Sequence, residues 1–223
     1  MNDILHIAHA NGFTGGTYNV LADRLSAHYK VHALDRLAHN PSYPVTDNWT
    51  HLIDEMIHHF ETSFHQPVIA VGHSLGGVIS LLVALRRPDL VKALILLDSP
   101  VMTPWQAQGM KLLKMTRLNE RIFPIRRIEE RQTEWADFNE AQAYFSGKSL
   151  MHNIHLQGRL MVPGAVIGGR NSEYFKRLNG AFMKGRLGMK VKWTDGGHMF
   201  PLEQPESTAD LIHHVVRELS GGR

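Results

Sequence analysis

The chain has 223 residues, 43% of them apolar and 20% charged, which is ordinary for a globular protein and enough for one domain, with or without an insertion. It has no cysteine, which excludes disulfides, a thiol nucleophile and a zinc–thiolate site. The net charge is +3, and residues 170–192 carry seven Lys or Arg against one acidic residue. Because no nucleic-acid motif accompanies these basic residues, we expect them to lie on solvated helix faces, and we expect no nucleic-acid partner.

Short apolar runs alternate along the chain with longer stretches that have helical spacing. The short runs predict strands at residues 4–10, 29–35, 68–71, 91–97, 164–168 and 189–194. The longer stretches predict helices at residues 18–28, from a cap at Thr46 or Asp47 to residue 60, at 78–85, at 173–184 and from Pro205 to residue 219. This alternation indicates an α/β protein, with a mostly parallel sheet that helices cover on both faces.

The alternation of strands and helices breaks after Pro100. Residues 101–160 are helix-like, rich in Met, Trp and Arg, and contain no convincing strand. We therefore divide the chain into an α/β core, residues 1–100 and 161–223, and a helical insertion, residues 101–160. Six large apolar side chains of the insertion could line a substrate pocket or form the insertion's own core: Met102, Trp105, Met110, Met115, Trp135 and Phe138.

The stretch PVIAVGHSLGGVISLLVALR, residues 67–86, combines an apolar strand, the pattern G-x-S-x-G and an apolar helix. Ser74 lies at the centre of the pattern, where a sharp turn between strand and helix holds a serine in a sparsely populated backbone conformation. Gly72 and Gly76 lie two residues to either side, and neither has a side chain that would clash inside so tight a turn. The helix that follows points free N–H groups toward any oxyanion that forms beside Ser74.

With GHSLGG between a strand and a helix, the chain resembles the α/β-hydrolase superfamily over nearly its whole length. The resemblance implies that residues 101–160 are the cap that many members carry between their sixth and seventh strands. The chain starts at what resembles the superfamily's third strand, so we expect the first two antiparallel strands to be absent.

A histidine and an acid should accompany the serine. His198 follows the last predicted strand in GGHMFPLEQPE, which is similar to the superfamily's histidine loop, and its task would be to take the proton of Ser74 and return it to the leaving group. The acid commonly follows the seventh strand, but the corresponding stretch, AVIGGRNSEYF, has Asn171, whose amide cannot support an imidazolium. Asp98, at the end of the sixth strand, resembles the displaced acid of haloalkane dehalogenases and some esterases, and it is the acid we expect. Glu173 is one alternative, and a site without a functional acid is another.

The resemblance also implies an oxyanion hole made of two backbone N–H groups. One belongs to Leu75, directly after the serine. The other comes from the loop after the first strand, where HAN at residues 9–11 is similar to the superfamily's His-Gly-X and makes Asn11 the donor. Gly12-Phe13 could instead be the Gly-X pair, which would make Phe13 the donor.

These residues and the resemblance predict a serine hydrolase, and most specifically a carboxylic ester hydrolase. Ser74 would attack the carbonyl, an acyl-enzyme would form, and His198 would activate the water that releases the product. The G-x-S-x-G turn serves other reactions too. A thioesterase, a C–C hydrolase, a lyase and a cofactor-free haloperoxidase are therefore alternatives. A non-catalytic ligand-binding relative without its acid, as Asn171 suggests, is a further alternative. The expected partner is a small ester-like substrate, and the sequence predicts neither its acyl group nor the oligomeric state.

The first ten residues, MNDILHIAHA, lack a basic segment followed by a long apolar run, so we expect no signal peptide. No run of about 18 apolar residues occurs, so we expect no membrane span and a cytoplasmic location. Of the 15 histidines, His51 and His59 could share one helix face with Glu55, as a metal site would need. The chain has no H-E-x-x-H pattern, and we expect no metal and no cofactor.

Overall fold

The computed structural model describes residues 3–37, 39–44, 49–99, 101 and 159–221. Residues 102–158, which hold nearly all of the predicted insertion and its six large apolar side chains, lie outside this description. The division of the chain into a core and a cap therefore stays a prediction. The helix cap predicted at Thr46 or Asp47 also lies outside the described residues.

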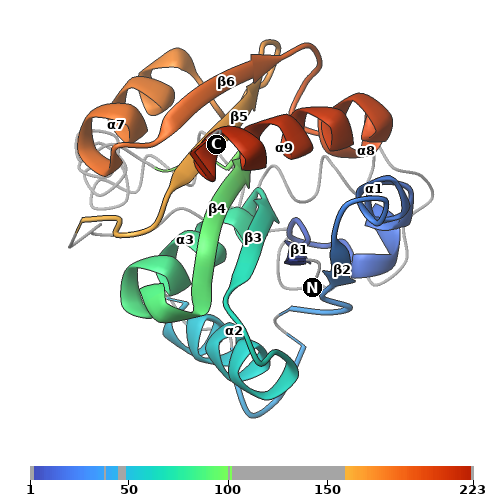
Figure 1. Cartoon of the computed structure of the whole chain (residues 1–223), viewed down its shortest axis with the longest axis vertical. Helices are drawn as coiled ribbons and strands as arrows, with labels where there is room; N and C mark the ends of the chain where they lie inside the picture. The colour runs from blue at the N-terminus through green and yellow to red at the C-terminus, as the bar shows by residue number, and fades with distance from the viewer. Residues whose placement is uncertain (1–2, 38, 45–48, 100, 102–158, 222–223) are drawn as a thin grey trace, which may run out of the picture. The chain divides into compact units, whose positions relative to one another are not determined.

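Six strands form one sheet in the described part of the chain (Figure 1). In chain order they are β1 (Ile4–Ala8), β2 (Lys30–Ala33), β3 (Val68–His73), β4 (Val91–Leu97), β5 (Gly164–Gly169) and β6 (Lys190–Thr194). Their order in space is β2-β1-β3-β4-β5-β6, and every neighbouring pair runs parallel. The prediction of an α/β fold built on a mostly parallel sheet is confirmed.

Helices cover both faces of this sheet, as predicted. The described helices are η1 (Gly15–Tyr18), α1 (Asn19–Leu25), α2 (Thr50–Ser63), α3 (Leu75–Arg86), η2 (Pro88–Leu90), α7 (Arg177–Leu187), α8 (Phe200–Glu203) and α9 (Pro205–Leu219). On one face, α1 and α9 lie side by side and pack with Ile7, Val71 and Ile95 into one apolar cluster (Figure 1). On the other face, α2 packs Phe60 against His6 of β1.

The central strands are buried because both of their faces are covered. Every residue of β3 and β5 is buried, as are six of the seven residues of β4, whereas the edge strands β2 and β6 are half-exposed. Each fully buried Leu or Ile of these runs stabilises the fold by about 1.5–3 kcal/mol. The side chains of the central strands are thus committed to packing, and polar groups free for chemistry lie beyond the ends of the strands.

Several helices differ from their predicted bounds: α1 ends at Leu25 and not at residue 28, and α3 begins at Leu75 and not at residue 78. Helix α7 begins at Arg177, four residues after the predicted start, because the hydroxyl of Ser172 accepts the N–H groups of Tyr174 and Phe175 and holds them in a turn instead. The single-turn helix α8 was not predicted, because four residues are too few to show a helical period. None of the described helices has the length and apolar character needed to cross a bilayer.

Candidate active site

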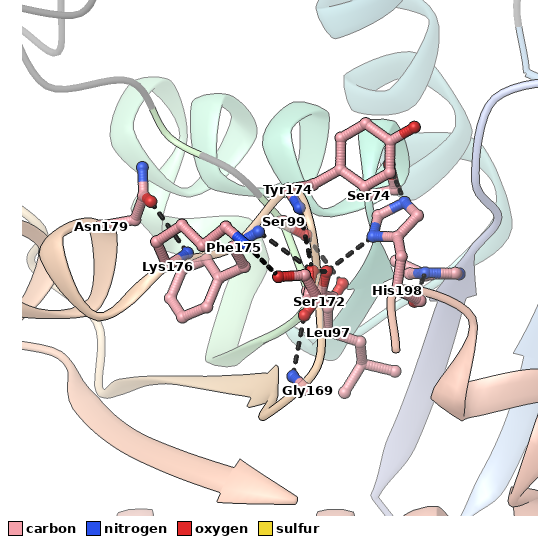
Figure 2. Close-up of polar contacts among 12 residues, drawn as sticks. Ser74, Leu97, Ser99, Gly169, Ser172, Tyr174, Phe175, Lys176, Asn179 and His198 are labelled. Atoms are coloured by element: carbon pink, nitrogen blue, oxygen red, sulfur yellow. Dashed lines mark hydrogen bonds and ion pairs between the residues drawn. The ribbon is translucent and has the colours of Figure 1, made fainter. Parts of the chain in front are cut away.

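The predicted serine, acid and histidine lie together at the carboxyl edge of the sheet. Figure 2 shows Ser74 and His198 of this group. Ser74 directly follows β3, Asp98 directly follows β4, and His198 lies four residues beyond the end of β6. The carboxyl ends of parallel strands meet at one edge, which brings together residues that are up to 124 positions apart in the sequence.

Ser74 occupies the turn between β3 and α3. Its φ is 52°, in a region that residues with a Cβ rarely adopt, and its N–H donates to the carbonyl of Leu97 at 3.0 Å. A Cβ on Gly72 would lie 2.4 Å from the backbone of α3, and a Cβ on Gly76 would lie 2.4 Å from the carbonyl oxygen of Ala8. The turn can close this tightly only with glycine at both positions.

His198 bridges the serine and the acid. Its Nε2 lies 3.1 Å from Ser74 Oγ, and its Nδ1 lies 2.6 Å from Asp98 Oδ2. A carboxylate only accepts hydrogen bonds, so Nδ1 carries the proton and Nε2 is left free to accept the serine proton. Figure 2 shows the ring of Tyr174 beside His198. The centroids of the two rings are 4.5 Å apart.

Asp98 is fully buried, and its φ of 44° makes it a second non-glycine residue of the site with a positive φ. Its Oδ1 accepts the N–H of Gly169 at 2.8 Å. Its Oδ2 accepts the hydroxyl of Ser172 as well as Nδ1 of His198. Three donors therefore surround the buried carboxylate and compensate for its loss of hydration.

The loop after β5, where the resemblance placed the usual acid, supplies hydrogen-bond donors to Asp98. Asn171 and Glu173 are both exposed. Within the described residues, neither forms a hydrogen bond or an ion pair with His198. Glu173 lies four residues before α7, so its predicted place in the first turn of that helix is wrong.

The two predicted oxyanion donors lie in different segments. Leu75 is the first residue of α3, where helix N–H groups have no intrahelical partner. In the loop after β1, Phe13 donates its N–H to the carbonyl of Ala10 at 3.2 Å, and His9 Nδ1 lies 2.8 Å from the same oxygen. The N–H of Asn11 belongs to the same trans peptide as that carbonyl and points the opposite way. Within the described residues the N–H of Phe13 is thus already bonded and that of Asn11 is not, which favours Asn11 over Phe13 as the predicted donor.

No metal centre adjoins these groups among the described residues. No three His, Asp or Glu side chains there are grouped so as to hold a metal ion. An open groove of about 410 Å³ lies between α7 and β6, away from the candidate site. Its lining residues are Arg177, Gly180, Ala181, Lys184, Val191 and Trp193.

Comparison with known proteins agrees with the fold. Residues 4–211 match the alpha/beta hydrolase family. The chain belongs to this family. As an alpha/beta hydrolase it is 28% identical over 184 residues to the uncharacterized protein sll0249 of Synechocystis, a match that covers 75% of this chain and 73% of that protein.

Two further relatives of this alpha/beta hydrolase match over shorter stretches. Mouse monoglyceride lipase is 29% identical over 125 residues, which cover 52% of this chain and 41% of the lipase. The pimeloyl-[acyl-carrier protein] methyl ester esterase of Yersinia enterocolitica is 28% identical over 95 residues, which cover 43% of this chain and 36% of the esterase. The aligned part thus spans less than half the length of either relative.

Solved structures share the fold at low sequence identity. A marine microorganism esterase has a TM-score of 0.69 at 18% identity, covering 96% of this chain and 95% of its own. The enol-lactonase from Burkholderia xenovorans LB400 has a TM-score of 0.69 at 16% identity, covering 97% and 92%. These likenesses establish the alpha/beta hydrolase fold.

Sequence reasoning missed four residues that support the site. Ser172 and Gly169 hold the carboxylate of Asp98. Tyr18 and His73 form a buried pair that is hydrogen-bonded to the backbone of Ala10 and of His198. The signal for Ser172 was its place in the loop after the fifth strand of this sheet. The signal for His73 was its position inside G-x-S-x-G, directly before the serine.

Proposed function

We propose that this alpha/beta hydrolase is a serine hydrolase that cleaves carboxylic esters through Ser74, His198 and Asp98. The observation that carries the proposal is the continuous chain of contacts from Ser74 Oγ to His198 Nε2, at 3.1 Å, and from His198 Nδ1 to the Asp98 carboxylate, at 2.6 Å. Among the relatives, a monoglyceride lipase and a methyl ester esterase are named for ester substrates, which favours esters over the other bonds that this fold can cleave.

Acylation follows from the direction of these hydrogen bonds. Ser74 Oγ attacks the ester carbonyl carbon and its proton moves to His198 Nε2. Asp98 stays ionised and stabilises the imidazolium, because its two oxygens keep their donors from Gly169 and Ser172. Collapse of the tetrahedral intermediate breaks the bond to the alcohol oxygen, which takes the proton from Nε2 and leaves.

Deacylation repeats these steps with water. Nε2, now neutral, accepts a proton from a water molecule whose oxygen attacks the acyl carbon. The second tetrahedral intermediate releases the acid, and the proton on Nε2 returns to Ser74 Oγ. The net reaction consumes one water for each ester and leaves the protein unchanged.

In both tetrahedral intermediates the carbonyl oxygen carries negative charge. We assign its stabilisation to the N–H groups of Leu75 and Asn11. Leu75 begins α3, whose N-terminal dipole favours an anion, and the Asn11 peptide is held by the two contacts to the carbonyl of Ala10. Loss of one such donor typically slows turnover by about 10²- to 10³-fold.

A fluorophosphonate probe tests the proposal directly, because it labels only a serine that a neighbouring base has activated. We expect wild-type protein to be labelled at Ser74 and to hydrolyse short p-nitrophenyl esters, and Ser74→Ala to do neither. Ser26→Ala is a matched control, since it removes an exposed hydroxyl whose hydrogen bond, within the described residues, goes to the carbonyl of Ala22 in α1. Absence of labelling in the wild type would instead support a non-catalytic ligand-binding protein. Faster turnover of acyl thioesters than of matched esters would move the assignment to a thioesterase.

A further inference from the structure

Tyr18 and His73 form a buried polar pair that the mechanism above does not use. Tyr18 is 1% exposed and His73 is fully buried, and Tyr18 Oη lies 2.7 Å from His73 Nδ1. Burying two polar side chains costs free energy unless each is hydrogen-bonded. The partners of the pair therefore show what it holds in place.

The hydrogen bonds of this pair all run in one direction. His73 Nε2 lies 2.9 Å from the carbonyl oxygen of His198, and a carbonyl only accepts, so Nε2 carries the proton. A neutral ring then presents Nδ1 as an acceptor, and the Tyr18 hydroxyl donates to it. Tyr18 Oη in turn accepts the N–H of Ala10 at 3.1 Å. Burial lowers the pKa of His73 well below its ordinary value, which keeps the ring neutral.

The chain of bonds joins three segments of the candidate site. At one end it holds Ala10, whose carbonyl shares a peptide with the N–H of Asn11. At the other end it holds the backbone of His198 itself. In the middle, His73 is the last residue of β3 and directly precedes Ser74. The nucleophile, the base and one oxyanion donor are thus tied together through two side chains whose described hydrogen bonds go to the backbone and to each other.

We propose that Tyr18 and His73 are positioning residues that hold the Asn11 N–H, Ser74 and His198 in register for the reaction. The predicted effect on the rate rests on the proposed ester hydrolysis at Ser74. The hydrogen bonds of Tyr18 and His73 do not depend on that proposal.

Tyr18→Phe removes the hydroxyl and keeps the ring. Displacing a catalytic group by about 1 Å from its productive position can lower the rate by about 100-fold. We therefore expect kcat, per active site titrated with fluorophosphonate, to fall about 10- to 100-fold in Tyr18→Phe, with KM nearly unchanged. Tyr29→Phe is the matched control, because Tyr29 is also buried and its Oη lies 2.9 Å from Nδ1 of another histidine, His213, on α9. We expect that control to keep wild-type kcat. Wild-type kcat in Tyr18→Phe, or an equal loss in Tyr29→Phe, would overturn the proposal.

Variants of His73 separate its two bonds. His73→Gln keeps a donor near the ε position for the His198 carbonyl and loses the acceptor for Tyr18, whereas His73→Asn keeps a group near the δ position and loses the link to His198. If the pair works as one unit, Tyr18→Phe should add little further loss in the His73→Gln background. Fully additive losses would mean that the two residues act separately, which contradicts the proposal.

A spectroscopic test needs no substrate. The imidazole ¹⁵N spectrum of the wild type at pH 7 should show a neutral His73 with its proton on Nε2, and the Nδ1 resonance should shift in Tyr18→Phe as its donor is lost. A charged ring, a proton on Nδ1, or an unchanged Nδ1 resonance would overturn the arrangement. The ¹⁵N spectrum does not depend on turnover. If the protein hydrolysed no ester, the proposed function would be contradicted, but the spectrum would still test the hydrogen bonds of Tyr18 and His73.

Discussion

Ser172 and Asp98, 74 positions apart in the sequence, are joined by a hydrogen bond from the serine hydroxyl to Oδ2 of the carboxylate. The same oxygen accepts Nδ1 of His198. The loop after β5, which in most members of the superfamily would supply the acid, here supplies a donor to an acid on the neighbouring strand. Because both bonds meet at one oxygen, we expect a substitution of Ser172 or of Asp98 to alter the position of the His198 ring.

Asp98→Asn should reduce kcat for ester hydrolysis by about 10⁴-fold, by analogy with the buried aspartate of serine proteases. An amide can donate to Nδ1, which would favour the wrong imidazole tautomer, and it cannot stabilise the imidazolium. Steady-state rates on a p-nitrophenyl ester measure the loss. Glu173→Gln is the control and should keep full activity, because Glu173 is exposed. Adding Asn171→Asp to Asp98→Asn should restore little, since Asn171 is also exposed; near-complete activity in Asp98→Asn would remove Asp98 from the mechanism.

Ser172→Ala should reduce kcat by about tenfold, because one charge-assisted hydrogen bond to the buried carboxylate is lost. It should also lower the melting temperature, since the same hydroxyl accepts the N–H groups of Tyr174 and Phe175. Ser172→Thr keeps a hydroxyl and should recover most of the rate. Ser80→Ala removes another buried hydroxyl, bonded to the carbonyl of Gly76, and should leave kcat unchanged. Equal rates in Ser172→Ala and the wild type would show that Gly169 alone suffices to hold Asp98.

The positions of Ser74, Asp98 and His198 could be predicted from the sequence, because each lies beyond an apolar run and parallel strands end at one edge of a sheet. Their catalytic roles stay predictions. The exact ends of the helices could not be predicted from the sequence, as the later start of α7 shows. That start depends on the hydroxyl of Ser172, a local bond that competes with helix formation and leaves no periodic signal.

The supporting contacts could not be predicted for a different physical reason. Tyr18 and His73 are 55 positions apart, and their hydrogen bond exists only because η1 and β3 are brought together by the packed sheet. Tyrosine at the start of a helix and histidine at the end of a strand are each ordinary residues for those places. Local propensity and hydrophobic period contain no information about such a pair, which only tertiary packing creates.

Gly76→Ala should destabilise the protein and slow ester hydrolysis. The new Cβ would lie 2.4 Å from the carbonyl oxygen of Ala8 and 2.5 Å from that of His9, so α3 and the loop that carries the proposed oxyanion donor must move apart. Gly185→Ala is the matched control: a Cβ there meets nothing within 4 Å, and alanine in a helix is more stable than glycine by up to about 1 kcal/mol. Thermal melts and kcat for both variants test the contrast. Similar melting temperatures for the two variants would contradict the tight packing of the turn.

A separate cluster, on the face of the sheet that α2 covers, should make stability depend on pH. His6 is fully buried, and within the described residues neither of its ring nitrogens has a hydrogen-bond partner. Its ring packs against His59, Phe60 and Phe64, with centroid distances of 5.2, 4.8 and 6.0 Å. Burial, and then the neighbouring histidines His59, His32 and His9, lower the pKa of His6 well below 6.5.

The sign of the effect follows from this lowered pKa. The unfolded chain binds a proton at His6 near pH 6.5 while the folded chain does not, so the contribution to stability is complete above about pH 6.5 and is lost as the pH falls below it. His73, also buried and with a lowered pKa, acts in the same direction. We expect the free energy of unfolding, measured by urea titration, to fall between pH 7 and pH 5. In His6→Phe the slope should be smaller by up to about 1.4 kcal/mol per pH unit, whereas His65→Asn, at an exposed position, should keep the wild-type slope. A wild-type slope in His6→Phe would mean that the pH dependence arises at other groups.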